Sequence, residues 1–339
     1  CFNANAQAAL SSVGLSDLIR DQGGVQLDQL RLGWNGSKLN LALTGGWALS
    51  RERFDQALVS AAEAAGARLR FQTGAVLEEI CSGERMVRLR PSDGAAVERV
   101  RARVVLVAAG LQHQVLATID ASSTRIAGSS RLGAGCLIDD DDEVYASGAI
   151  HMAVARHGYV GLVRREDGAL NLAAAFDPAA LRSAGGAARA ARAVISEAGF
   201  AVPRALETSR WQLTSALTRH ADAFAGRRFL LLGDASGYVE PFTGEGMAWA
   251  LAAGAAVAPF AEEAQRQWSH DLEQRWHQRL KLLTVNRQRL CRLLSTLLRQ
   301  PLATDAMFRL GGHWPSLPQR VISSLNQVSP HALPSDSCR

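Results

Sequence analysis

The sequence predicts a mixed α/β (α+β) fold, in which a parallel α/β unit is interleaved with an antiparallel sheet and followed by helices. Three patterns support this prediction. The apolar run 229–232 leads into a glycine turn and an Ala-rich stretch, segments between residues 25 and 176 alternate at strand period, and apolar residues after 260 recur at helical spacing. With 339 residues, 47% of them hydrophobic and 20% charged, the chain is long enough for one large domain or two interleaved ones.

The first third of the chain predicts a helix, a hairpin and a second helix. Residues 1–15 are expected to be helical and to end at Gly14. Residues 25–43 alternate at strand period around the turn 34–37, which contains Asn-Gly. Ser50 suits the N-cap of a helix that ends at Gly66.

A β-rich stretch follows the second helix. Residues 68–71 predict a short strand, and residues 76–104 predict a three-stranded meander. The run 104–110 then predicts a buried strand that ends in Gly110.

The middle of the chain predicts an antiparallel sheet with a helical cover. Its strands are expected at 133–138, 144–154, 159–164 and 169–176, as a meander, with a helix over 178–199 on one face. The five contiguous acids at 139–143 lack the spacing of a calcium-binding loop, so a solvated turn is the preferred interpretation. No metal site is predicted.

The most informative segment runs from Phe229 to Met247, Phe-Leu-Leu-Leu-Gly-Asp-Ala-Ser-Gly-Tyr-Val-Glu-Pro-Phe-Thr-Gly-Glu-Gly-Met. A short apolar run suits a strand buried on both faces, and Asp234 follows it at the edge where open α/β sheets bind ligands. Gly244 and Gly246 allow the backbone to approach a flat ligand closely. The free N–H groups of the helix that begins here favour negative charge on that ligand.

This segment resembles the second flavin-binding motif of FAD-dependent oxidoreductases of the p-hydroxybenzoate hydroxylase-like superfamily. The run 241–246, Pro-Phe-Thr-Gly-Glu-Gly, is most similar to the geranylgeranyl reductase-related branch. The resemblance implies that Asp234, after Gly233, hydrogen-bonds the ribityl chain of FAD and that Pro241 touches the flavin ring. It also implies that the residues of the next turn offer backbone N–H groups, namely Gly244, Glu245 and Gly246.

The resemblance implies further cofactor contacts elsewhere. Relatives carry an Arg at the start of the helix that follows the hairpin, which points to Arg51, with Arg53 as the alternative. Gly110 would approach the cofactor closely, although Ala109 stands where aromatic hydroxylases carry Asp. Cys1 matches a Cys position near the flavin in reductase relatives and is a weak catalytic candidate, with a small buried residue as the alternative.

The implied organisation is a Rossmann-like FAD-binding domain interleaved with an antiparallel substrate domain. The FAD-binding domain takes residues 1–22, 46–120 and 219–260, the substrate domain takes 23–45 and 121–218, and residues 261–339 form a helical C-terminal region. No Gly-x-Gly-x-x-Gly occurs, and the chain begins at Cys1. We therefore expect a fragment that lacks the first βαβ unit; the alternative is a complete protein that dispenses with the motif.

Charge and cysteine usage restrict the partners. The net charge of +5 comes almost entirely from scattered Arg, so nucleic-acid binding is not predicted. Five dispersed Cys fit a reducing, cytoplasmic location. The helical tail is expected to pack on the FAD domain. The alternative is peripheral membrane contact through a series of arginines, namely Arg275, Arg279, Arg287, Arg289, Arg292 and Arg299.

The leading functional hypothesis is reduction of carbon–carbon double bonds in a hydrophobic isoprenoid- or polyketide-like molecule, with NAD(P)H or a reduced carrier as electron donor. An FAD-dependent monooxygenase is the alternative, and an inactive flavoprotein fragment is the alternative of another class. The Trp-x-Trp-x-Ile-Pro run of flavin halogenases and the aromatic-x-Trp-x-Phe-Pro run of geranylgeranyl reductases are both absent. Residues 157–163 occupy the place of the latter, so Tyr159 either lines the pocket as a weak catalytic candidate or packs within its strand. No oligomeric state is predicted.

Overall fold

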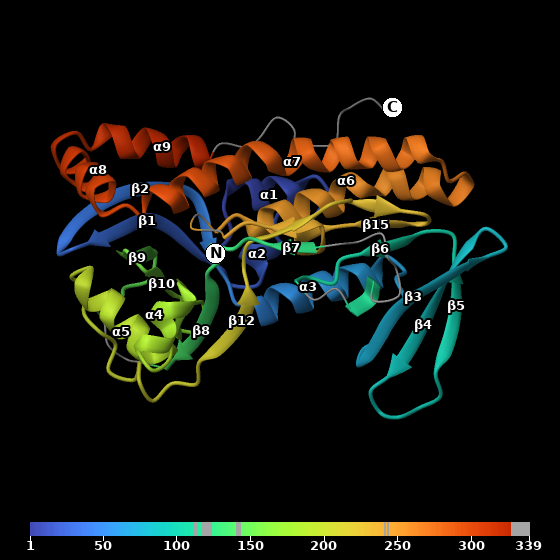
Figure 1. Ribbon diagram of the computed structural model, residues 1–339, viewed down its shortest axis with the longest axis horizontal. Helices are drawn as coiled ribbons and strands as arrows, with labels where there is room; N and C mark the ends of the chain where they lie inside the picture. Colours follow the sequence, from blue (N-terminus) through green and yellow to red (C-terminus); the bar gives the residue numbers. More distant parts are fainter. Residues whose placement is uncertain (112–113, 117–123, 140–143, 241, 243, 327–339) are drawn as a thin grey trace.

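A computed structural model describes residues 1–339 apart from 112–113, 117–123, 140–143, 241, 243 and 327–339. Its largest element is a seven-stranded sheet with the order β12-β8-β11-β10-β9-β1-β2 (Figure 1). The strands are β1 Val25–Trp34, β2 Ser37–Ala48, β8 Leu132–Ile138, β9 Ala149–Ala155, β10 Gly158–Arg164, β11 Leu170–Phe176 and β12 Gln212–Ala216. The β1–β9 pair is parallel, and the other pairs in this sheet are antiparallel.

The β1–β2 hairpin confirms the prediction from alternation. Asn35 and Gly36 have φ angles of 45° and 77°, the left-handed conformation at both central positions that a type I′ turn requires. The hairpin extends the sheet beyond β9, so strands β1 and β2 lie in the same sheet as strands β8 to β12.

Helices cover one face of this sheet, as predicted. Helices α4 (Pro178–Ser183) and α5 (Ala187–Glu197) pack there, with α5 against β9 and β10. Side chains alternate along β10, so Val160 and Leu162 face α5 in a fully buried cluster, whereas Tyr159 and its alternate neighbours face the opposite side.

The motif segment adopts the predicted strand–turn–helix arrangement. Strand β15 (Phe229–Leu231) is fully buried and pairs in parallel with β6 (Val105–Val107), and β14 (Ala225–Gly226) completes a three-stranded sheet. The 3₁₀ turn η2 (Gly233–Ser236) follows β15 and leads through β16 (Gly237–Tyr238) to α6 (Gly246–Arg266). Helix α1 (Ala4–Ser11) packs on α6.

The remaining elements surround this centre. Helix α2 (Leu18–Asp21) contacts α3 (Arg51–Ala64), whose N-cap Ser50 accepts a hydrogen bond from the Arg53 N–H as expected. The predicted meander is present as three strands, β3 Thr73–Cys81, β4 Glu84–Pro91 and β5 Glu98–Ala102. A further small sheet combines β16 with β13 (Arg219–Ala221) and β7 (Thr124–Ile126), and η1 (Gln114–Leu116) is a short 3₁₀ turn.

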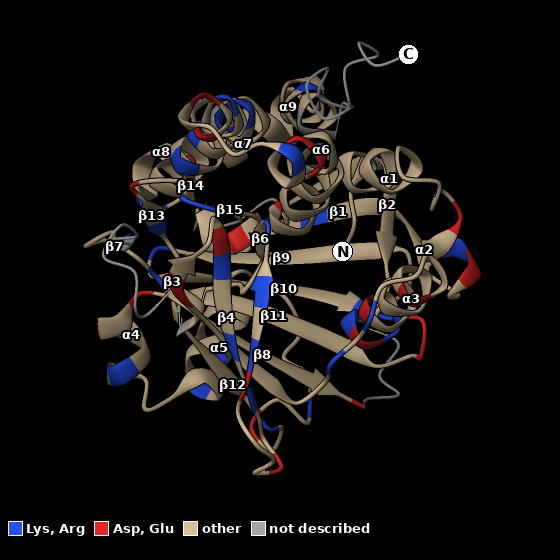
Figure 2. Ribbon diagram, turned by 90° about the vertical axis from the view of Figure 1, so that its right-hand side faces the viewer, with Lys and Arg blue, Asp and Glu red and all other residues tan. Residues whose placement is uncertain are grey.

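The C-terminal region is helical, as predicted. It contains α7 (His270–Leu297), α8 (Pro301–His313) and α9 (Ser316–Asn326). Both ribbon views place these helices in one outer layer, with α8 and α9 against β2 (Figures 1 and 2). Within the described part of the chain, no helix combines the length and apolar character that crossing a membrane requires.

Five local predictions are wrong. The buried strand expected over 104–110 is only β6, Val105–Val107, and Leu106 in it is 41% exposed. Residues 68–71 are not a strand, and Phe71 is exposed. The strand expected from 144 begins at Ala149, and β8 pairs with β11 rather than with β9, because register depends on long-range packing that local alternation does not encode. The single helix expected over 178–199 is divided into α4 and α5 by Gly185 and Gly186, which have φ angles of 77° and 127°.

Candidate functional site

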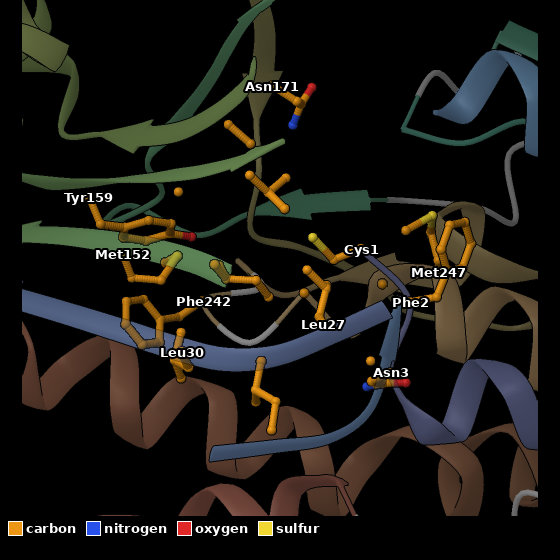
Figure 3. Close-up of a pocket in the computed structure, with 18 of the residues that line it drawn as sticks. Cys1, Phe2, Asn3, Leu27, Leu30, Met152, Tyr159, Asn171, Phe242 and Met247 are labelled. Atoms are coloured by element: carbon orange, nitrogen blue, oxygen red, sulfur yellow. The ribbon is translucent and has the colours of Figure 1, made fainter. Parts of the chain in front are cut away.

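A cavity of about 380 Å³ lies against the face of the seven-stranded sheet that α4 and α5 leave free (Figure 3). Its walls are predominantly apolar and come from distant parts of the chain. Strands β1, β9 and β10 contribute Leu30, Met152 and Tyr159, the loop before α6 contributes Phe242, and α9 contributes Ile322. Such a concave apolar site with few polar groups is typical of small-molecule pockets.

Strand periodicity explains which side chains reach the cavity. On β10, alternate residues Tyr159, Gly161 and Val163 line it. A Cβ on Gly161 would lie 2.9 Å from the Met152 sulfur, so glycine at this position keeps the cavity open beside Met152.

The loop that precedes α6 forms another wall. Gly244 and Gly246 line the cavity, and Gly244 has a φ of 69°, which disfavours other residues. The N-terminal turn of α6 has backbone N–H groups without intrahelical partners beside the cavity. Between the glycines, the Glu245 side chain is buried and accepts a hydrogen bond from Trp249 Nε1 at 3.1 Å, and Glu245 is not among the cavity's lining residues.

Asp234 lies beside the large cavity rather than in its wall. With Gly233 it lines an adjoining space of about 10 Å³ between η2, α6 and α7. Its carboxyl group forms no hydrogen bond or ion pair with another described residue, and burial raises its pKa to about 6. A partly buried acid without a donor among the described residues is a polar group that a ligand hydroxyl could satisfy.

Arg51 lies at the large cavity and close enough to Asp234 to affect its pKa. It lines the large cavity, and its charge opposes the raised pKa of Asp234. Arg51 also forms an ion pair with Asp55 at 2.9 Å, one turn along α3. The alternative, Arg53, instead contacts Gln22 O and Glu166, so the structure favours Arg51 as the residue at the cavity.

Tyr159 points its hydroxyl toward the cavity (Figure 3). Its ring packs edge-on against Phe242 with the centroids 5.1 Å apart, and the Arg131 guanidinium lies 5.7 Å from the ring centroid. Burial, together with nearby Glu240, raises the pKa of Tyr159 well above 10, so the phenol stays protonated at neutral pH.

A buried ion cluster lies behind Tyr159 and was not predicted. Arg131, before β8, donates to Glu240 at 3.2 Å and to Asp177 at 3.0 Å, and both Arg131 and Glu240 are almost fully buried. Arg299, after α7, lies 3.5 Å from the same two carboxylates. The cluster therefore joins the sheet, the loop before α6 and the C-terminal helices.

Of the other predicted site residues, one lines the cavity and two others do not. Cys1 lines it, and its thiol is visible there in Figure 3. Gly233 has a φ of 53°, and a Cβ there would lie 3.2 Å from Ala250 on α6, so this glycine allows η2 to approach the helix. Gly110 has a φ of 66° but is not among the cavity's lining residues. Pro241 lies outside the described residues.

Several positioning residues were missed by the sequence analysis. Glu166, in the β10–β11 turn, accepts hydrogen bonds from the Ser50 N–H at 2.9 Å and the Ser50 hydroxyl at 2.6 Å, and so fixes the start of α3 near Arg51. Asn171 on β11 adds a polar group to the cavity wall. Neither has a local signal, because Glu166 depends on Ser50, 116 residues away, and Asn171 depends on the placement of its strand beside the cavity. The His, Cys, Asp and Glu residues whose placement is described form no group of three or more that suits a metal ion.

Comparison with solved structures shows a shared fold. A flavoprotein/dehydrogenase from Cytophaga hutchinsonii matches with a TM-score of 0.76 and 16% identity over 96% of this chain and 82% of that one. The myxobacterial chondrochloren halogenase CndH, described as a variant of FAD-dependent halogenases, matches with a TM-score of 0.72 and 15% identity over 98% and 85%. The p-nitrophenol 4-monooxygenase PnpA from Pseudomonas putida DLL-E4 gives 0.70 and 16% over 94% and 86%.

Sequence comparison adds no family. No protein-family model matches the chain, and no curated protein matches it. At 15–16% identity the structural likeness concerns the fold. The chain thus has the mixed α/β fold of these flavoproteins, with a helical C-terminal region.

Proposed function

We propose that this chain belongs to an FAD-dependent oxidoreductase that binds an apolar substrate in the 380 Å³ cavity. The observation that carries the proposal is the partly buried carboxyl group of Asp234, which has no partner among the described residues, near a glycine-rich helix start that lines an apolar cavity.

The described residues fit the ring and ribityl end of a flavin. Asp234 would accept a hydrogen bond from a ribityl hydroxyl and so lose its unpaired state. Gly244, Gly246 and the first turn of α6 would hold the flavin ring through backbone N–H groups. Bound flavin would supply the redox chemistry, and the protein would supply position, electrostatics and a dry site.

The cavity walls support an apolar substrate. Leu, Ile, Met and Phe side chains would exclude water, and Tyr159 and Asn171 would orient a polar group of the substrate. The phenol of Tyr159 stays protonated because its pKa is raised, so it would hydrogen-bond a substrate atom in the cavity and pass its proton only as negative charge develops on that atom.

Reduction of a carbon–carbon double bond in an isoprenoid- or polyketide-like molecule is the reaction that we favour. Such a reduction adds a hydride to one carbon and a proton to the other, and Tyr159 offers a proton source in an otherwise apolar cavity. The electron donor would be NAD(P)H or a reduced carrier.

Monooxygenation is the second candidate, and the neighbours favour it. One of the similar structures is named as a p-nitrophenol 4-monooxygenase, and another as a variant of FAD-dependent halogenases. In that reaction Tyr159 would hydrogen-bond the substrate rather than donate a proton to carbon.

Flavin retention tests the common part of both candidates. We expect the purified chain, after incubation with FAD and desalting, to keep a visible flavin absorption band. A chain that retains no flavin, alone or with an upstream extension of its reading frame, contradicts the proposal; a chain that retains it leads to the test of the reaction.

Oxygen dependence separates the two reactions. The flavin-loaded protein would be reduced with dithionite under anaerobic conditions and mixed with isoprenoid polyenes. Flavin reoxidation without oxygen, together with a saturated product, supports reduction. Hydroxylated product that forms only after oxygen is admitted supports monooxygenation and excludes the reductase.

Tyr159→Phe tests the proton donor. We expect kcat to fall by roughly 10²-fold, with KM and flavin retention nearly unchanged, because loss of a general acid typically costs 10²–10⁴-fold. Val163→Ala, elsewhere in the same wall, serves as a control that alters packing alone. A kcat for Tyr159→Phe that equals the wild-type value across the pH range would contradict the assigned role.

A further inference from the structure

The outer layer of α7, α8 and α9 exposes large apolar side chains. They are between 44% and 85% exposed, whereas most residues of this size are buried in the rest of the chain. The members are Leu293, Leu302, Leu310, Trp314, Leu317 and Val321. We call these residues and the exposed arginines among them, Arg289, Arg292, Arg309 and Arg320, the basic–apolar surface.

The same layer is strongly basic. Over residues 270–326, from the start of α7 to the end of α9, the sequence contains nine of the chain's 37 Lys and Arg residues but only three of its 32 acids, Asp271 and Glu273 in the first turn of α7 and Asp305. Asp305 accepts a hydrogen bond from Trp34 Nε1 at 2.6 Å and so faces the sheet. Because the whole chain carries +5, the rest of it is net negative, and the positive charge is concentrated on this layer; Figure 2 shows Lys and Arg on α7 and α8.

The structure also selects among the arginines that the sequence pointed to. Arg275 pairs with Glu263 and Asp271, and Arg299 belongs to the buried ion cluster. Arg289 and Arg292 are exposed.

Each of the three helices repeats the same combination on its outer side. On α7, Arg289, Arg292 and Leu293 are spaced three and four residues apart and share one face. On α9 the same spacing joins Leu317, Arg320 and Val321.

Helix α8 presents the same mixture at two points along its length. Leu302 lies at its start, and Arg309 and Leu310 lie near its end, all of them exposed. Every helix of the layer therefore mixes aliphatic and Arg side chains on its outer face.

We propose that the basic–apolar surface binds the surface of an anionic lipid bilayer. An amphipathic helical layer of this composition places its Leu and Trp side chains at the acyl boundary while the Arg side chains extend to the lipid phosphates. A purely apolar partner would bury the Leu side chains but would desolvate the Arg charges without pairing them. An anionic bilayer buries the Leu side chains and pairs the Arg side chains with lipid phosphates.

The layer is firmly attached to the domain that holds the cavity. Gln319 on α9 hydrogen-bonds both the N–H and the carbonyl oxygen of Ala42, each at 2.9 Å, in the manner of a neighbouring strand. Ile322, on the same helix, lines the cavity. A bilayer under α9 would therefore lie one helix away from the cavity. That proximity would help a lipid-like substrate to reach the cavity, a benefit that rests on the proposed function. Binding of the chain to vesicles does not rest on it.

Co-sedimentation with lipid vesicles tests the surface directly, with the full chain and without flavin or substrate. We expect the chain to sediment with vesicles of mixed phosphatidylcholine and phosphatidylglycerol, and to be released by salt. The paired variants Leu310→Gln/Trp314→Gln and Arg289→Gln/Arg292→Gln should each lower the partition coefficient about tenfold. Leu302→Gln, at an 85% exposed position, gives a variant with little structural consequence that should also weaken binding.

Leu213→Gln is the matched control, because Leu213 on β12 is 60% exposed but lies outside the layer. Its vesicle binding should equal that of the wild type. The proposal is overturned if the chain does not sediment, or if it binds neutral phosphatidylcholine vesicles equally well. It is also overturned if the surface variants separate a dimer on a sizing column without changing vesicle binding, because the occupant would then be a second copy of the chain.

Discussion

Replacing Asp234 by Asn should stabilise the flavin-free chain, whereas replacing it by Ala should abolish retention of flavin. The carboxyl group is partly buried and has no hydrogen-bond or ion-pair partner among the described residues, and its pKa is raised from 3.8 to about 6. A shift of this size corresponds to a cost of roughly 3 kcal/mol at neutral pH, which an uncharged amide would remove. We therefore expect a higher melting temperature for Asp234→Asn near pH 7, and loss of the flavin absorption band after desalting for Asp234→Ala, which removes the acceptor.

The direction of the pH dependence follows from the raised pKa. Below about pH 4 the carboxyl group is protonated in both the folded and the unfolded chain, so it contributes nothing. As pH rises to about 6, the unfolded chain releases its proton first, and the folded state loses stability relative to it. The difference in melting temperature between Asp234→Asn and the wild type should therefore be small near pH 4 and reach its full size above pH 6.

A control and a contrary result make this test specific. Asp222→Asn changes an acid that pairs with the exposed Arg125, and it should alter neither melting temperature nor flavin retention appreciably. If Asp234→Ala kept flavin at wild-type occupancy, the assignment of Asp234 as a ribityl ligand would be wrong. An unchanged melting temperature of Asp234→Asn near pH 7 would instead contradict the cost assigned to the partly buried, unpaired carboxylate.

The parts of the fold that local patterns encode were predictable. Alternation and the Asn35-Gly36 turn fix the β1–β2 hairpin within one stretch of sequence, and the run from 229 to 247 contains its own strand, turn and helix start. By contrast, the exposed segment at 68–71 has a strand-like pattern but forms no strand.

The candidate site was predictable where one motif supplies its residues and not where tertiary contacts do. Gly244, Gly246 and Arg51, which the resemblance assigned to the cofactor, line one cavity, and their contact with FAD stays a prediction. The contact between Ser50 and Glu166 spans 116 residues, and that between Arg131 and Glu240 spans 109. No periodicity or turn signal reports such pairings, because they arise only when sheet register and helix packing are already in place.

Arg131→Met should be the most destabilising single change at the buried ion cluster. The variant removes the partner of Glu240, whose carboxylate is almost fully buried, and leaves it only the more distant Arg299. Removal of one member of a buried ion pair typically costs 3–5 kcal/mol, because the remaining charge is uncompensated. We expect a loss of about this size in the free energy of unfolding, measured by urea denaturation.

A second substitution, at Glu240, distinguishes the effect of an unpaired buried charge from the effect of lost side-chain packing. Adding Glu240→Leu to Arg131→Met should recover much of the lost stability, because replacement of a buried ion pair by apolar side chains is often close to neutral. Arg125→Met, which removes a 77% exposed side chain from its ion pair with Asp222, is the matched control and should cost about 1 kcal/mol or less. If Arg131→Met were no more destabilising than this control, the ion pairs of the cluster would not contribute measurably to the free energy of unfolding. If the double variant were as unstable as the single one, packing of the Arg131 side chain would account for the loss.

Because Arg131 also lies against the ring of Tyr159, partial recovery with a weakened flavin band would show that the cluster positions the cavity wall as well as stabilising the fold.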